Sequence, residues 1–166
     1  MHNKILLLFS AVSLLAACSN TAEKQSITLN HGLFMDTATR RYGIEVTNDT
    51  VFYCEEQPGT PVRYSYYYSK EDTNIDSLAA AANNLFDESL HYNEEGIADA
   101  TLCQLQIKRG AKLIQVNFFE ELLTGEQLAM INKIDGMKKH RFYKMRYHQF
   151  PQDMLFQKLP PPPPVE

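Results

Sequence analysis

The sequence lacks the short motifs that mark several classes of enzyme active site. It contains no G-x-S-x-G nucleophile motif, no Gly-rich phosphate loop and no H-E-x-x-H zinc motif. Adjacent acidic residues occur, as in Glu55-Glu56 and Glu120-Glu121, but neighbours along a strand point to opposite faces. A pair of carboxylates sharing one proton is therefore not expected there. These patterns predict no catalytic residue, no metal site and no cofactor, and they leave open an enzyme whose site is assembled from distant residues.

The chain also lacks an excess of positive charge. It has 16 basic and 20 acidic residues and a formal net charge of −4, which argues against a nucleic-acid binder. Residues 71–99 hold eight acidic residues and no Lys or Arg, among them the spacing His91-x-x-Glu94, which offers two metal ligands where a closed site needs four. The opposite charge gathers in a basic stretch of five residues: Lys138, Lys139, Arg141, Lys144 and Arg146. Two solvated faces explain this pattern, and contact of the basic stretch with anionic lipid or glycan is the alternative.

No apolar run is long enough to cross a bilayer. The run from Ile5 to Leu15 is shorter than the roughly 20 residues that a spanning helix needs, and it follows the basic Lys4, as in a secretion signal. Leu15-Ala16-Ala17-Cys18 resembles the bacterial lipobox. The resemblance implies that residues 1–17 are a signal peptide and that lipid is attached to the Cys18 sulfur, with enough acyl chains for stable membrane anchoring. The alternative is an ordinary secretory peptide in which Cys18 is incidental.

The remaining organisation follows from this cleavage point. Ser19, where an inner-membrane retention signal would place Asp, favours the outer membrane of the bacterial envelope. We expect a tether at residues 18–26, a single α+β domain at 27–150 and a Pro-rich tail at 151–166. Pro160–Pro164 holds a polyproline II segment of about 15 Å. It is either a stiff chain end or a ligand for an aromatic groove on another envelope protein.

Hydrophobic periodicity predicts a mostly antiparallel sheet of about five to seven strands packed by two helices, with two ββα units as a finer expectation. The expected strands are residues 27–35, 41–47, 50–55, 62–68, 101–108, 111–119 and 141–150. The pattern Ser69-x-x-Asp72 predicts a helix that starts at Ser69 and ends near Asp87. The capping box Thr124-x-x-Gln127 predicts a second helix through about Met137, which Asp135-Gly136 would end early.

Loop chemistry predicts the register of two hairpins. A two-residue loop at Asn48-Asp49 places residue 46 opposite 51 and 44 opposite 53, so that Ile44, Val46, Val51 and Tyr53 share one face. A loop at Arg109-Gly110 places residue 105 opposite 114 and 103 opposite 116. The face it predicts is apolar: Cys103, Leu105, Ile107, Ile114 and Val116. The helices offer apolar stripes to such a face: Ile75, Leu78, Ala79, Ala82, Leu85 and Phe86 in the first, Leu128, Ile131 and Ile134 in the second.

Two groups of residues leave alternatives open. Cys54 and Cys103 form a disulfide, which an oxidising compartment allows, or they are two separately buried thiols; a catalytic cysteine is disfavoured because neither has a base nearby in sequence. Four tyrosines gather in one strand: Tyr64, Tyr66, Tyr67 and Tyr68. They are sheet structure or a binding surface, since the amphipathic Tyr side chain serves in both.

Residues 27–137 are similar to a small, uncharacterised domain family of envelope lipoproteins with a hairpin–helix–hairpin–helix layout. The likeness is carried by the strand Thr50-Val51-x-Tyr53, the helix start Ser69-Lys70-Glu71 and the hairpin of residues 99–116. The resemblance implies no catalytic residue. The expected function is a non-catalytic binding or accessory module of the envelope, and the alternative is an envelope hydrolase or small-ligand carrier.

Overall fold

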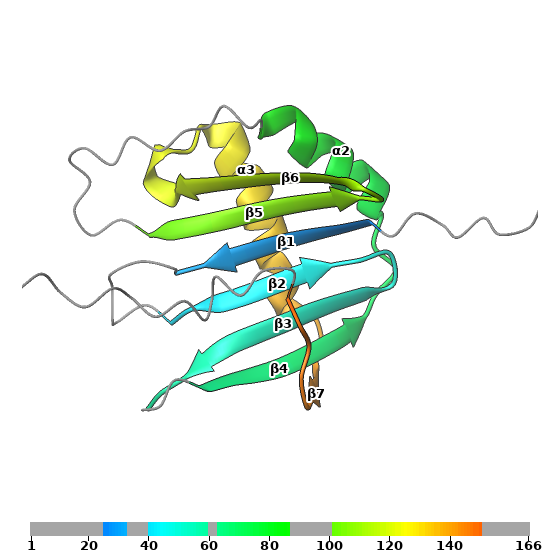
Figure 1. Ribbon diagram of the computed structural model, residues 1–166, viewed down its shortest axis with the longest axis vertical. Coiled ribbons are helices and arrows are strands. Elements are labelled where there is room, and N and C mark those ends of the chain that lie inside the picture. Colours follow the sequence, from blue (N-terminus) through cyan, green and yellow to red (C-terminus); the bar gives the residue numbers. More distant parts are fainter. Residues whose placement is uncertain (1–24, 33–39, 60–62, 87–100, 151–166) are drawn as a thin grey trace, which may run out of the picture.

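The computed structural model describes residues 25–32, 40–59, 63–86 and 101–150. The predicted signal peptide, Cys18 and the Pro-rich tail lie outside these ranges. Within them, seven strands form one antiparallel sheet in the order β6-β5-β1-β2-β3-β4-β7, and two α-helices pack on one of its faces (Figure 1). The predicted α+β class is confirmed. No helix in the described ranges is long and apolar enough to cross a membrane.

The elements have the following bounds. The strands are β1 Gln25–His31, β2 Tyr42–Val46, β3 Thr50–Gln57, β4 Arg63–Lys70, β5 Leu102–Arg109, β6 Lys112–Phe119 and β7 Tyr143–Met145. The α-helices are α2 Ile75–Leu85 and α3 Gly125–Asp135, and the short 3-10 helices are η1 Glu120–Leu122 and η2 Gly136–Lys139.

The first hairpin has the predicted register. Val46 lies opposite Val51 and Ile44 opposite Tyr53, as a two-residue loop at Asn48-Asp49 requires. Ile44, Val46 and Val51 are fully buried on the face that the helices cover, and Tyr53 packs against the same core. The pleat of a strand sends alternate side chains to opposite faces, so the correct register places all four on one side.

The predicted register of the second hairpin is wrong by two residues. Arg109 pairs with Lys112 and Leu105 with Val116, so the loop is Gly110-Ala111 rather than Arg109-Gly110. Gly110 has a φ of 58°, and a two-residue hairpin turn needs positive φ at its first central position, which glycine adopts without strain. Because the shift is an even number of residues, each side chain keeps the predicted face, and the five predicted apolar residues belong to one core.

That core lies between the sheet and the two helices. Its fully buried members include Ile27 and Leu29 on β1, an interior strand that both helices contact. Phe86, directly after α2, packs at a ring-centroid distance of 5.7 Å from Phe118 on β6. The predicted stripe of α2 is buried at Ile75, Leu78, Ala79 and Ala82.

The first helix starts later than its predicted position at Ser69. β4 continues through Lys70, and Ser69 is buried opposite Val51 in the pairing with β3. Asn74 caps α2 instead, because its side-chain oxygen accepts a hydrogen bond of 3.1 Å from the Ser77 backbone N–H. The cross-strand pairing of Ser69 with Val51 therefore overrides the local Ser-x-x-Asp pattern, which carries no information about pairing with distant residues. α2 ends at Leu85, two residues before the predicted end.

The second helix starts where the capping box predicts. The Thr124 hydroxyl accepts from the Gln127 N–H at 3.3 Å, and the Gln127 side-chain oxygen accepts from the Thr124 N–H at 2.9 Å. α3 ends at Asp135, and η2 continues the chain beyond it. The Gln127 amide also donates a hydrogen bond of 3.0 Å to the carbonyl of Leu85, in the last turn of α2. The Gln127 side chain thus caps the start of α3 and also links α3 to the end of α2 by a hydrogen bond.

The second face of the sheet carries polar and aromatic side chains. Over β1, β5 and β6, hydrogen bonds of 2.9 to 3.3 Å join Asn30 to Gln104 and Gln104 to Asn117, and both Asn30 and Gln104 are fully buried. Over β2 and β3, the chain after β7 crosses this face (Figure 1). His148 stacks on Phe52 at 3.7 Å and lies 2.6 Å from the Glu45 carboxylate. The predicted strand at 141–150 is wrong beyond Tyr143–Met145, because residues 146–150 lie across the sheet instead of along its edge.

Candidate functional site

Three potential metal ligands converge at one end of the sheet, on the helix-covered face. His31 ends β1 and lies directly opposite Cys103 on β5. Glu120 follows β6, and its Oε2 lies 3.2 Å from Nε2 of His31. The potential ligand atoms of the three residues all lie within 4.8 Å of one another. Cys103 is fully buried, whereas the side chains of His31 and Glu120 are 14% and 33% exposed, so the cluster reaches from the core to the surface.

The histidine ring is held in place from one side. Tyr42 on β2 stacks on it, with ring centroids 4.5 Å apart and an interplanar angle of 16°. The Tyr42 hydroxyl donates a hydrogen bond of 2.5 Å to Asp135, at the end of α3, and Lys138 pairs with that carboxylate at 2.6 Å. The Lys138 ammonium also lies 3.9 Å from the centroid of the Tyr42 ring. Burial, and then the hydrogen bond to Asp135, raise the pKa of the Tyr42 hydroxyl, so it stays a hydrogen-bond donor.

The carboxylate of Glu120 acts on the buried thiol of Cys103. Burial raises the pKa of the Cys103 thiol, and the neighbouring Glu120 carboxylate raises it further. The Glu120 contact uses one ring nitrogen of His31. The other, Nδ1, is buried and has no hydrogen-bond partner among the described residues. A cation between these three side chains would favour the thiolate form of Cys103 and offset the charge of Glu120.

Sequence patterns did not reveal this cluster, because its members are far apart in the chain and form no spacing motif. His31 and Cys103 are brought together by the pairing of β1 with β5, which closes a loop of about 70 residues. The available signal was positional: His31 and Glu120 each stand at the end of an apolar strand. The spacing that did suggest ligands, His91-x-x-Glu94, lies outside the described residues.

The two cysteines of the domain are not bridged. Within the described part of the chain, Cys54 and Cys103 are both free and buried. Cys103 belongs to the core under the helices, and Cys54 belongs to a separate cluster with Tyr66 and Phe150 on the second face. Two strands, β1 and β2, also separate β5 from β3. Of the two alternatives left open by the sequence, the structure therefore has two separately buried thiols.

The four tyrosines of β4 divide between the two faces of the sheet. Tyr64 and Tyr66 contribute to the aromatic cluster of the second face, where Tyr68 also points, and Tyr66 is buried. Tyr67 points to the helix side and lies 5.8 Å from Tyr53. Alternation along a strand requires this division. A surface formed by all four residues is therefore not possible, and only one face of β4 contributes to an exposed aromatic surface.

That surface is completed by residues after η2. Tyr143 and Tyr147 are 49% and 55% exposed, and they lie 5.9 Å from Tyr68 and 5.2 Å from Tyr66, respectively. One exposed residue of the predicted basic stretch, Arg141, lies over the Tyr143 ring at 5.5 Å. We call Arg141, Tyr143 and Tyr147 the aromatic–basic surface.

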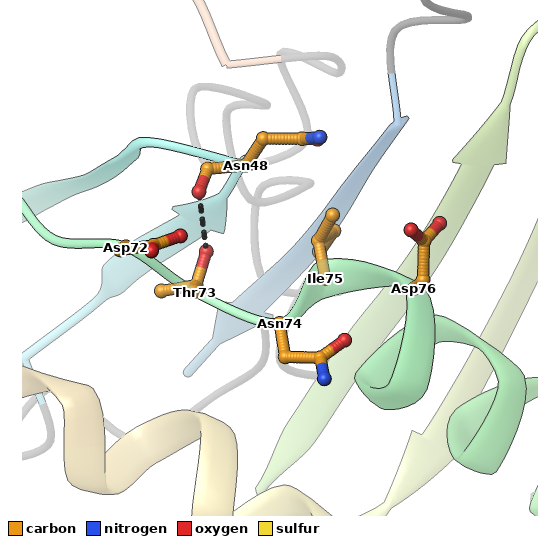
Figure 2. A pocket seen from close by; sticks show the side chains of 6 residues that line it. All are labelled: Asn48, Asp72, Thr73, Asn74, Ile75 and Asp76. Carbon is orange, nitrogen blue, oxygen red and sulfur yellow. Dashed lines mark hydrogen bonds between the residues drawn. The ribbon is translucent and has the colours of Figure 1, made fainter.

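A polar pocket of about 380 Å³ lies at the start of α2 (Figure 2). It is lined by Asn48, Asp72, Thr73, Asn74, Ile75 and Asp76. The Thr73 hydroxyl donates to the Asn48 carbonyl across it. The side chains of Asp72, Asn74 and Asp76 point in different directions, so they do not converge on one ligand (Figure 2). The pocket is part of the turn that leads from β4 into the helix.

No protein-family model, no curated protein and no solved structure matches this chain. The resemblance to envelope lipoproteins therefore remains a prediction from the lipobox and the layout of strands and helices. Cys18 and Pro160–Pro164 lie outside the described residues. The candidate sites within them are the His31–Cys103–Glu120 cluster and the aromatic–basic surface.

Proposed function

We propose that this chain is a lipid-anchored protein of the bacterial outer membrane whose folded domain is a non-catalytic binding or accessory module. The lipobox resemblance at Leu15-Ala16-Ala17-Cys18 supports the anchor. The aromatic–basic surface supports binding, and it is the single observation that carries this part of the proposal. Tyrosine and arginine are enriched at the energetic centres of protein interfaces, where an aromatic ring and a charged group act side by side.

The construction of the surface suits a binding role. Tyr143 is part of β7 and Tyr147 rests edge-on against the buried Tyr66, at an interplanar angle of 65°. His148 and Phe150 fix the chain directly after Tyr147 against the sheet. A tyrosine whose backbone is already fixed loses little conformational entropy when it is covered by a partner. The exposed rings are therefore preorganised contacts.

The anchor is tested by replacing its sulfur. Cys18→Ser should abolish incorporation of labelled palmitate and move the chain from the membrane fraction to the soluble fraction. Cys54→Ser is the matched control, since it removes a buried thiol and leaves the lipobox intact. Separation of inner and outer membranes then tests the location. Palmitate labelling that persists in Cys18→Ser would exclude lipidation at this residue.

The binding role is tested by affinity capture from native envelopes, followed by mass spectrometry. The double variant Tyr143→Ser, Tyr147→Ser should lose a partner that the unmodified chain captures. Leu122→Ser is the control, because Leu122 is a similarly exposed apolar residue, 57% exposed, outside this surface. Equal capture by both variants would contradict a role for the surface.

A third chain, truncated after Leu159, tests the Pro-rich tail. A partner lost only on truncation would assign the contact to Pro160–Pro164 and an aromatic groove on another envelope protein. If none of the chains captures a specific partner, the adaptor role is wrong, and screens for hydrolase substrates and small ligands test the alternative.

We also propose that the domain contains two ββα units, β3–β4–α2 and β5–β6–α3. In each unit two strands of 8 residues are followed by a helix of 11 residues on the same face. The sheet order supports a two-fold relation, because β5 and β6 flank the central β1–β2 pair on one side as β3 and β4 do on the other. An experimental structure in which the helices cross their hairpins at clearly different angles would contradict the duplication.

A further inference from the structure

We propose that His31, Cys103 and Glu120 bind a thiophilic divalent ion of the zinc class. This inference is independent of the lipid anchor and of the aromatic–basic surface, which lies on the other face of the sheet. It rests on the meeting of imidazole, thiol and carboxylate at the joint end of β1, β5 and β6.

The geometry is close to that of a tetrahedral zinc site. Zinc bonds of about 2.0 to 2.3 Å place neighbouring ligand atoms about 3.3 to 3.7 Å apart. The Nε2 of His31 and the Oε2 of Glu120 are 3.2 Å apart, and no pair of ligand atoms in the cluster exceeds 4.8 Å. The largest movement required, between the Cys103 sulfur and one of the other two ligand atoms, is therefore about 1 Å.

The ligand set selects the kind of ion. Thiolate and imidazole favour zinc and similar transition metals, whereas magnesium and calcium prefer oxygen ligands alone. Three protein ligands leave the fourth tetrahedral position for water or an external ligand. Access to that position comes from the side of Glu120, whose side chain is one-third exposed.

An ion pair between His31 and Glu120 is the simpler explanation, and one observation counts against it. The pair does not account for Cys103, whose sulfur lies in the same cluster as the imidazole and the carboxylate. Tyr42 and Asp135 have the role of positioning residues, because they orient the ring without reaching the ion.

The experiment is a titration of the reduced, metal-free full chain in detergent with Co²⁺, followed by displacement with Zn²⁺. We expect one equivalent of Co²⁺ to produce a thiolate-to-cobalt charge-transfer band that Zn²⁺ removes. Cys103→Ser should abolish the band, and Cys54→Ser, the matched buried thiol on the opposite face, should retain it. Zn²⁺ should raise the midpoint of thermal unfolding of the unmodified chain and of Cys54→Ser, but not that of Cys103→Ser.

A second variant keeps the test decisive if Cys103→Ser does not fold. Glu120→Gln changes a surface-accessible carboxylate and should raise the Kd for Co²⁺ at least about tenfold in a chain whose circular dichroism is unchanged. Glu121→Gln is its control, because it neutralises the adjacent carboxylate outside the cluster. The proposal is wrong if the unmodified chain gives no charge-transfer band, if the band survives in Cys103→Ser, or if Glu120→Gln and Glu121→Gln bind Co²⁺ as tightly as the unmodified chain.

Discussion

Replacing Gln127 with Glu should destabilise this domain, although glutamate is favoured at the same position of most helices. Gln127 is the third residue of α3, where either Glu or Gln completes a capping box and where a negative charge also interacts favourably with the helix dipole. Here, however, the side-chain amide nitrogen of Gln127 also makes a hydrogen bond outside the capping box. It donates to the carbonyl of Leu85 at 3.0 Å, and Gln127 is only 8% exposed.

The two effects have opposite signs and different sizes. A carboxylate at the start of a helix contributes about 0.3 to 1 kcal/mol. Loss of the donor leaves the Leu85 carbonyl, in the last turn of α2, without its partner, which costs about 1 to 3 kcal/mol for a buried group. The negative end of the α2 dipole would also face the new carboxylate. We therefore expect Gln127→Glu to lower the free energy of unfolding by about 1 to 2 kcal/mol.

Urea denaturation at neutral pH measures this difference, with an unchanged slope as the sign that only stability has changed. Thr124→Ala is a useful comparison, because it removes the other half of the capping box and should cost about 1 kcal/mol. The difference in free energy of unfolding between Gln127→Glu and the unmodified chain should shrink below about pH 4. A protonated carboxyl can again donate a hydrogen bond to the Leu85 carbonyl. Equal or greater stability of Gln127→Glu at neutral pH would refute the proposed link between the helices.

Three further predictions concern an ion pair, the two buried thiols and a core phenylalanine. Arg41 binds Glu56 through two hydrogen bonds of 2.8 and 3.0 Å and lowers the pKa of that carboxyl below its ordinary 4.5, so the stability from this pair should be present above about pH 4.5 and lost as the pH falls. Urea denaturation between about pH 3 and pH 6 should accordingly show that the free energy of unfolding changes less with pH in Glu56→Gln than in the unmodified chain. Burial raises the pKa of Cys54 to about 12 and that of Cys103 further, so a thiol reagent at about pH 8 should label both in the metal-free chain only after unfolding, as measured by mass spectrometry. Phe86→Ala should lower the free energy of unfolding by about 3 to 5 kcal/mol in urea denaturation, because Phe86 is fully buried between α2 and β6.

The parts of the fold that depend on alternation and local turn chemistry were predictable from the sequence. Asn48-Asp49 determines both the loop and the register of β2 and β3, since the buried faces of the two strands leave no other alignment. In the second hairpin, alternation alone allows any even shift, and the position of Gly110 within the turn decides among the alternatives. Ser69 shows the opposite case, because a capping pattern of four residues carries no information about a strand that pairs with β3 up to Lys70.

The candidate metal cluster was not predictable for a different reason. His31 and Cys103 become neighbours through the position of β1 between β2 and β5, and strand order in a sheet depends on long-range pairing that no local pattern encodes. The basic residue of the aromatic–basic surface was predictable from the sequence, but the placement of its tyrosines was not. The sequence showed the basic stretch of residues 138–146, but the continuous strand predicted at 141–150 would have placed neighbouring side chains on opposite faces. The departure of the chain from the edge after Met145 places Tyr147 beside Tyr66 instead.

The position of β1 has a mechanical consequence. β1 is paired along its length with β2 and β5, and it begins seven residues after Cys18. For a lipidated chain, those residues span at most about 25 Å, so the domain would stay close to the bilayer surface. Force applied between the membrane and the domain would act along an interior strand of the sheet, so both rows of hydrogen bonds would have to shear together before the strand could leave. An anchor on an edge strand would allow its hydrogen bonds to open one after another.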